Sequence, residues 1–179
     1  EPNVVITEFI INMDNVYHDY DNTNLDVSER VKEQAQSLAE HDVPFYVLTN
    51  SPDQAVDKDK FHIVNIELFQ HYSGISIFFY RLLMAYDFLQ AHPEIEKAAL
   101  TDASDVTMLN YPFDNIQDDT LYMGDEWGLL GDTWIINTNN SPYFIKKFIA
   151  EHQMLPTVNM GLIIGTRAIL LEFLGIILK

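Results

Sequence analysis

Short apolar runs, separated by polar or helix-patterned segments, recur along the first half of the chain. Runs rich in β-branched and aromatic residues, without helical periodicity, are typical of buried strands. They predict strands at residues 4–11, 44–49, 61–66 and 97–101. Because helical segments lie between these strands, we expect an α/β fold with a mostly parallel sheet flanked by helices.

The expected helices begin or end at recognisable capping residues. Asp26 and Glu29 have the spacing of a capping box, and apolar residues then recur at helical intervals up to residue 39. A largely apolar helix is expected from residue 74 or 75 to about residue 91, where a His-Pro pair ends it. Pro142 at the first helical position predicts a helix to about residue 152, and Thr166 caps a final helix.

The second half of the chain is less regular. Strands are expected at residues 121–123, 134–136 and 158–165, the last as a buried strand that contains two glycines. The sequence contains no internal repeat, low-complexity tract or linker. We therefore expect a single domain that covers residues 1–179.

The charge balance limits the classes of ligand. With 27 acidic and 10 basic residues the formal net charge is −17, so the chain repels polyanions and nucleic-acid binding is disfavoured. A nucleotide is compatible with this charge only where a bound cation, or a local cluster of basic groups, meets its phosphates. The chain contains no cysteine, which excludes disulfides, thiolate zinc sites and cysteine nucleophiles.

The two ends of the sequence carry expectations about location and completeness. The start lacks the basic, apolar and cleavage regions of a signal peptide, and Arg167 and Glu172 interrupt the apolar C-terminal stretch. We therefore expect a cytoplasmic protein without a membrane span. The apolar side chains of residues 170–178 are expected to be covered by further chain or by an oligomer partner, so the natural protein is expected to be longer.

An acidic pair, Asp102 and Asp105, follows the strand predicted at residues 97–101. Open α/β sheets bind their ligands at the carboxyl ends of strands. Two carboxylates suit Mg²⁺ or Mn²⁺ and leave coordination positions for substrate phosphates, which indicates a nucleotide diphosphate site. Acidic residues after a strand also form turns and helix N-caps without any ligand, so both interpretations stay open.

Arg81 lies in a largely apolar predicted helix, where a buried guanidinium needs a partner. One interpretation pairs it with an aspartate at the end of the following strand. The other places it on a diphosphate beside a metal ion. The residue pattern favours neither, and both roles are compatible with each other.

Two motifs in the second half are further candidates. A glycine inside an apolar strand marks a bulge or a close approach to a ligand, so Asn159 beside Gly161 is placed to offer its amide to a sugar hydroxyl. The alternative is a packing glycine and an asparagine bonded to backbone. Asp125, Glu126 and the tryptophan that follows suit carbohydrate recognition at a strand end, and they are equally typical of a surface turn.

Taken in order, these motifs resemble those of GT-A-type glycosyltransferases, which use a nucleotide-sugar donor. The resemblance is to the glycosyltransferase domains of procollagen lysyl hydroxylases and to related bacterial transferases. It rests on the helix segment Tyr80-Arg81-Leu82-Leu83, the strand end Thr101-Asp102-Ala103-Ser104-Asp105-Val106, the segment Asn110-Tyr111-Pro112-Phe113, the strand end Gly124-Asp125-Glu126 and the strand Asn159-Met160-Gly161-Leu162-Ile163-Ile164-Gly165.

On the donor side, the resemblance implies a role for each matching residue. Asp102 and Asp105 would hold Mn²⁺ or Mg²⁺ against the diphosphate of the donor, for which a UDP-sugar is the first choice. Arg81 and Ser104 would lie beside the diphosphate, and Asn12 would belong to the loop that contacts the nucleoside.

On the acceptor side, Asn159 and Gly161 would lie near the transferred sugar or the acceptor, with Gly161 counted among the donor-binding residues. Glu126 or Asp125 would be the catalytic carboxylate. Members of the family usually add a third metal ligand, commonly histidine, after the Asn-x-Gly strand, and no histidine follows His152 here. We therefore expect the GT-A-like domain to be truncated at its C-terminus, with degeneration of the site as the alternative.

The implied function is a metal-dependent glycosyltransferase that moves a hexose from a nucleotide diphosphate sugar to a hydroxyl acceptor. One alternative is a degenerate, non-catalytic GT-A-like binding module. A nucleotidyltransferase is less favoured, because residues 12–24 contain no Gly, Lys or Arg for a phosphate-binding loop. The sequence also lacks P-loop, dinucleotide-binding and hydrolase-elbow patterns, and its six histidines show no metal-ligand spacing.

Overall fold

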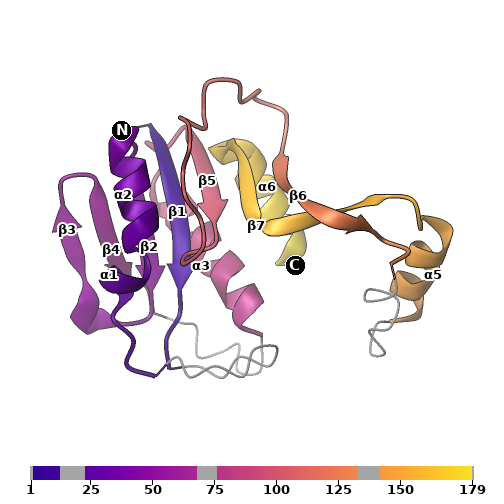
Figure 1. Cartoon of the computed structure of the whole chain (residues 1–179), viewed down its shortest axis with the longest axis horizontal. Helices are drawn as coiled ribbons and strands as arrows, with labels where there is room; N and C mark the ends of the chain where they lie inside the picture. The colour runs from indigo at the N-terminus through magenta and orange to yellow at the C-terminus, as the bar shows by residue number, and fades with distance from the viewer. Residues whose placement is uncertain (1, 13–22, 68–75, 133–141, 179) are drawn as a thin grey trace. The chain divides into compact units, whose positions relative to one another are not determined.

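The computed structural model describes residues 2–12, 23–67, 76–132 and 142–178, whose helices and strands are drawn in Figure 1. The elements follow in the order β1 (Asn3–Phe9), α1 (Val27–Arg30), α2 (Lys32–Glu40), β2 (Phe45–Thr49), a 3₁₀ turn (Pro52–Gln54), β3 (Val56–Lys58), β4 (Phe61–Asn65), α3 (Ile77–Ala91), β5 (Lys97–Thr101), β6 (Tyr122–Leu129), α5 (Tyr143–Glu151), β7 (Pro156–Thr166) and α6 (Arg167–Ile177). Strands and helices alternate through the first half, so the predicted α/β class is confirmed.

Contacts divide the chain into two compact units. The first unit comprises residues 1–122 and 163–179, and the second comprises residues 123–162. Each unit is described below by itself. The expectation of a single domain stays a prediction.

The described strands form one mixed sheet of seven strands, in the order β3-β4-β2-β1-β5-β7-β6. Strands β4, β2, β1 and β5 run parallel, and β3 is antiparallel to β4. In the register, Thr7 of β1 lies between Val47 of β2 and Thr101 of β5. β1 and β5 are neighbouring parallel strands, so their carboxyl ends lie side by side.

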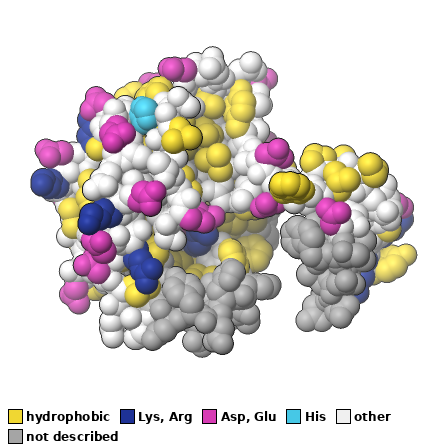
Figure 2. Space-filling view, viewed as in Figure 1, with side chains coloured by type: hydrophobic (Ala, Val, Ile, Leu, Met, Phe, Trp, Pro, Cys, Tyr) yellow, Lys and Arg dark blue, Asp and Glu magenta, His cyan; other side chains and the backbone are white. Residues whose placement is uncertain are grey.

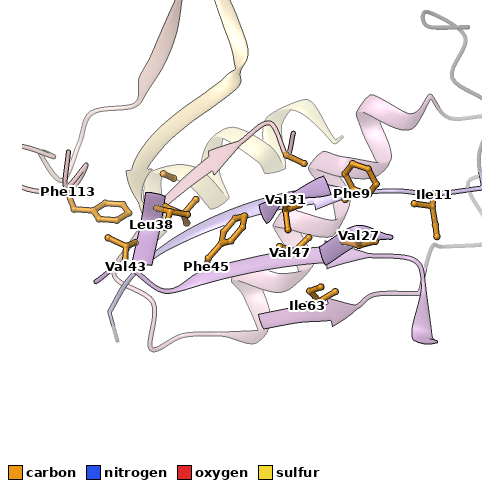
Figure 3. Close-up of a cluster of buried hydrophobic side chains, with 13 residues drawn as sticks. Phe9, Ile11, Val27, Val31, Leu38, Val43, Phe45, Val47, Ile63 and Phe113 are labelled. Carbon is orange, nitrogen blue, oxygen red and sulfur yellow. The ribbon is translucent and has the colours of Figure 1, made fainter. Parts of the chain in front are cut away.

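Helices cover both faces of the parallel strands, which explains why β1 is buried along almost its whole length. Figure 3 shows the cluster on one face, where Val27, Val31 and Leu38 pack against Phe45 and Ile63 of the sheet. Each such side chain contributes about 1.5–3 kcal/mol when it is fully buried. β1 also contacts α3, and α3 contacts α6.

The first unit differs from the sequence prediction in two places. The helix expected after Asp26 is divided at Val31, whose φ of −97° and ψ of 5° separate α1 from α2. The sequence does not predict β3, because this short strand at the sheet edge is polar and largely exposed. Both predicted caps are present, since Asp26 accepts a hydrogen bond from Glu29 N at 3.2 Å and Thr166 accepts one from Ile169 N at 3.5 Å.

In the second unit, β6 is longer than the sequence predicts. It continues to Leu129, so Gly124, Asp125 and Glu126 lie within a strand and not after one. Pairing with β7 explains this length, because backbone hydrogen bonds still join the two segments beyond β6, with Leu130 N donating to the carbonyl of residue 155 at 2.9 Å. Pairing of β6 with β7 has therefore outweighed the tendency of Gly124 and Gly128 to form turns.

Strand β7 is also less buried than expected. Ile163 and Gly165 are buried, but Val158, Asn159 and Met160 are exposed. The buried strand predicted at residues 158–165 is therefore correct only for its C-terminal part. The strand predicted at residues 134–136 lies outside the described residues.

The apolar helix α6 packs against α3 and β5. Leu170 and Leu174 are fully buried, whereas Ile176 is 65% exposed. The chain itself thus provides part of the cover that was expected from another segment or partner. Within the described part of the chain, no helix has the length and apolarity needed to cross a membrane.

Candidate functional site

The candidate site lies where the order of the parallel strands changes direction. From β1 the chain proceeds to β2 and β4 on one side, and then returns to β5 on the other side of β1. Open α/β sheets bind ligands at the carboxyl ends of the two strands that flank such a point. A cavity of about 260 Å³ opens at this position in the first unit.

Three elements supply the walls of this cavity, which we call the β1–β5 cavity. They are the end of β1, the first turns of α3 and the segment that follows β5, with lining residues Glu8, Phe9, Ile10, Ile77, Phe78, Arg81, Asp102, Ala103, Ser104 and Asp105. The structure thus brings together four of the residues that the sequence analysis selected: Arg81, Asp102, Ser104 and Asp105.

Arg81 forms ion pairs with two carboxylates in this cavity. Its Nη2 lies 2.8 Å from Asp102 Oδ1, and its Nε lies 3.4 Å from Glu8 Oε2. The structure therefore shows the pairing of Arg81 with an aspartate at the strand end, which is one of the two interpretations of this arginine. The guanidinium is held from two sides, which fixes its orientation next to the acidic segment after β5.

Glu8 is the site residue that the sequence analysis missed. Its side chain is only 5% exposed, within a strand that is buried from Val4 to Phe9. An acidic residue inside a buried strand, together with an arginine in an apolar helix, is the signal that would have found the pair. This signal is useful only when the two segments are known to meet in the fold. The sequence does not indicate that, because Glu8 and Arg81 are 73 residues apart.

Burial changes the protonation chemistry of this group. Loss of water raises the pKa of Glu8 to about 7, against the opposing effect of the Arg81 charge and with a smaller raising effect of Asp102. Burial also lowers the pKa of Arg81, but the charges of Glu8 and Asp102 outweigh it and raise that pKa overall. Arg81 is therefore always charged, while Glu8 titrates near neutral pH.

The cavity carries an excess of negative charge. One guanidinium faces the carboxylates of Asp102 and Asp105, and Glu8 adds a third negative charge when it is ionised. Such a cavity attracts cations. Oxygen donors from carboxylates are the ligands that Mg²⁺ and Mn²⁺ prefer, so the donor set fits a divalent cation.

The protein offers few ligands for such an ion. In residues 2–12, 23–67, 76–132 and 142–178, no group of three or more His, Cys, Asp or Glu side chains is arranged to hold a metal. Asp102, whose side chain is 38% exposed, already gives one oxygen to Arg81. Within the described chain, the Asp102 and Asp105 pair would therefore bind a metal mainly through positions completed by water or substrate phosphates.

Asn12, selected as a donor contact, has a different role from the cavity residues. Its Oδ1 accepts a hydrogen bond from Asn24 N at 3.1 Å, and its φ is 57°. Asn tolerates this left-handed conformation better than most residues. The bond ties together the two described ends of the segment between β1 and α1.

The second unit contains the other group of selected residues. Asn159 Nδ2 donates to Glu126 Oε2 at 3.1 Å, and Gly161 N donates to Asn159 Oδ1 at 2.7 Å. The carbonyl oxygen of the Asn159 amide is thus bonded to backbone, as the alternative interpretation expects, while its NH2 group gives one of its two N–H donors to a side chain. The three residues form one hydrogen-bonded group on the β6–β7 pair.

Asp125 does not belong to this group. Successive side chains of a strand point to opposite faces, so Asp125 and Trp127 share the face opposite to Glu126. Trp127 is 96% exposed. The structure therefore separates the two carboxylates between which the sequence could not choose.

Compared with protein-family models and with curated proteins, the sequence shows no match.

Proposed function

We propose that the chain is a metal-dependent glycosyltransferase of the GT-A type, which moves a hexose from a nucleotide diphosphate sugar to a hydroxyl acceptor. The observation that carries this proposal is the acidic β1–β5 cavity at the point where the strand order reverses. There Asp102 and Asp105 line the same cavity as a fixed arginine.

In this proposal Asp102 and Asp105 bind Mn²⁺ or Mg²⁺, and a UDP-sugar binds through its diphosphate. When bound, the cation would neutralise the negative charge that grows on the departing nucleoside diphosphate. Ser104 lines the same cavity and would donate its hydroxyl to a phosphate oxygen.

Arg81 would add a second positive charge beside the diphosphate. Its ion pairs with Glu8 and Asp102 hold the guanidinium in place before the ligand arrives, so little reorganisation is needed during the reaction. Glu8 is then a positioning residue. It acts on the ligand only through the orientation and charge of Arg81.

Transfer breaks the bond between the anomeric carbon and the diphosphate oxygen and forms a bond to the acceptor oxygen. The acceptor hydroxyl must lose its proton to a base. We assign this role to Glu126, because Asn159 holds its carboxylate by a hydrogen bond, and we keep Asp125 as the alternative carboxylate. Asn159 and Gly161 would contribute polar contacts to the sugar or the acceptor.

One observation favours a second candidate, a non-catalytic GT-A-like module that binds a nucleotide without transfer. The described residues bring no third metal-ligating side chain to Asp102 and Asp105. Such a module would bind UDP in the presence of Mn²⁺ and would show no turnover of any UDP-hexose with simple hydroxyl acceptors.

Isothermal titration calorimetry with UDP, in the presence and absence of Mn²⁺, tests the donor site. We expect binding that requires Mn²⁺ and is lost in Asp102→Asn and Asp105→Asn. The matched control is Asp114→Asn, which removes the charge of an exposed aspartate. The preceding residue, Phe113, accepts a hydrogen bond from Lys97 at the start of β5, whereas Asp102 follows the end of this strand. Metal-independent binding, or equal loss in all three variants, would refute the proposed donor site.

A further inference from the structure

A second cavity, of about 540 Å³, lies in the first unit between α2 and the β3–β4 hairpin, and we call it the hairpin groove. It is lined by residues of α2, of the segment before β2 and of the β3–β4 turn, among them Lys32, Ala35, Ala39, Lys58, Lys60 and Phe61. β2 and β4 begin at Phe45 and Phe61, so the groove lies at the amino ends of these strands. It is therefore separate from the β1–β5 cavity, which lies at the carboxyl ends.

We propose that the hairpin groove binds a small organic anion that combines one carboxylate with an apolar chain or ring. Its volume falls within the range of about 300–1,000 Å³ that is usual for small-molecule pockets. The proposal rests on two features, an apolar floor and a cationic rim, and is independent of the proposed transferase activity.

The floor of the groove is apolar, and most of its accessible surface comes from Phe61, Ala35 and Ala39, because Phe45 and Val43 are each only 2% exposed. The rings of Phe45 and Phe61 lie with their centroids 6.0 Å apart, and Phe45 and Val43 belong to the buried core shown in Figure 3. Ala35 and Ala39 add small side chains on the α2 side of the groove. A ligand with an apolar body can therefore lie on an existing hydrophobic surface without opening the core.

The rim carries three of the ten basic residues of the chain, Lys32, Lys58 and Lys60. This concentration is unusual in a protein with a formal net charge of −17. Figure 2 shows Lys and Arg side chains gathered on the side of the first unit that carries α2, β3 and β4, among acidic side chains. Basic side chains therefore interrupt the acidic surface at this groove.

Two of the three lysines already have carboxylate partners. Lys60 Nζ lies 2.7 Å from Asp42 Oδ1, and Lys32 Nζ lies 3.3 Å from Glu29 Oε1. Lys58 is exposed, and the structure shows no ion pair between it and another described residue. Its ammonium group is therefore the one best placed to receive the charge of a ligand.

The balance of charges limits the ligand to a single negative charge. Lys32 and Lys60 are each paired with a carboxylate and Asp59 lines the groove as well, which leaves Lys58 as the lysine of the lining that can meet the charge of a ligand. A polyphosphate or a polyanion would meet these carboxylates and the acidic remainder of the surface. A carboxylate needs only one ammonium group, and its apolar body would cover the floor.

Two-dimensional NMR of the full chain tests this proposal with decanoate as the probe and decyltrimethylammonium as the matched cation, both below their micelle concentrations. We expect decanoate to shift the amides of residues 35–45 and 58–61 and to leave those around residues 102–105 unchanged. The cation carries the same tail and should not produce this pattern.

Two variants separate the charge from the apolar floor. Lys58→Gln should weaken decanoate binding by about threefold, as expected for loss of one exposed ion pair. Ala39→Phe, at an exposed position on α2, should fill the groove and abolish the shifts. Lys147→Gln makes the same charge change on α5 of the second unit and should have no effect. Equal shifts with both probes, or unchanged decanoate binding in both Lys58→Gln and Ala39→Phe, would overturn the proposal.

Discussion

Arg81 of α3 and Asp102 after β5 form an ion pair, with Arg81 Nη2 2.8 Å from Asp102 Oδ1. The same aspartate is the first of the two carboxylates proposed to hold a metal ion. Asp102 must therefore share its charge between a fixed internal cation and any metal that binds. This relationship connects the stability of the first unit to its proposed chemistry.

Removing the guanidinium should destabilise the fold. Glu8 is buried beside Arg81, so Arg81→Met leaves a buried carboxyl group without its ion-pair partner. Breaking such a buried pair costs about 3 kcal/mol or more. We expect a loss of this size in the free energy of unfolding, measured by urea denaturation at pH 8, where Glu8 is ionised.

Arg30→Met is the control for this change, because Arg30 is exposed at the end of α1. Arg81→Lys should recover part of the lost stability, since a lysine keeps the charge but cannot contact both carboxylates in the same geometry. Equal stabilities of Arg81→Met and Arg30→Met would show that the ion pairs are not structurally important.

The buried Glu8 predicts a specific pH dependence of stability. Its pKa is raised from the ordinary value of 4.5 to about 7, so the folded protein binds this proton more tightly than the unfolded chain does. The protonated Glu8 contributes its full stabilisation to the free energy of unfolding below pH 4.5, and this contribution is lost as the pH rises to about 7. The loss amounts to about 3 kcal/mol by the usual conversion of pKa shifts.

Glu8→Gln removes this titration and keeps a similar shape. The free energy of unfolding of the wild type, relative to Glu8→Gln, should therefore fall between pH 4.5 and pH 7 and stay constant above that range. Glu40→Gln, at an exposed position on α2, should follow the wild-type profile. Parallel profiles of wild type and Glu8→Gln would contradict the raised pKa.

In the proposed transfer reaction, the hydrogen bond between Asn159 and Glu126 favours Glu126 as the base. Glu126→Gln should lower the rate of sugar transfer by about 100-fold, the usual size of a general-base effect, and leave UDP affinity unchanged. Asp125→Asn should have little effect, because that side chain lies on the opposite face of β6. A large loss in Asp125→Asn alone would reverse the assignment.

Local sequence patterns predicted the elements that are marked by an apolar run or by a capping residue. The apolar run at residues 97–101 is β5 with the same bounds, and the caps at Asp26 and Thr166 are present. β3 and most of β6 have no such signal. Their strand conformation comes from pairing with β4 and β7, which a local pattern does not record.

The residues of the candidate site also differ in whether a local sequence pattern marks them. The segment from Asp102 to Asp105 was found because it directly follows a clear strand, and strand ends are where α/β sheets bind ligands. Glu8 was missed because its importance depends on Arg81, which approaches it only in the folded chain. Helix and strand alternation also leaves the strand order undetermined, so the sequence alone did not place the end of β1 beside that of β5.

The most direct test of the central claim is paramagnetic NMR with Mn²⁺ and UDP on the full chain. Mn²⁺ bound by Asp102 and Asp105 should broaden the amide signals of residues 8–10 and 102–106 and leave those of residues 56–61, at the β3–β4 hairpin, sharp. The broadening should disappear in Asp102→Asn and persist in Asp114→Asn. Broadening confined to other acidic segments, or equal in both variants, would contradict a metal and diphosphate site in the β1–β5 cavity.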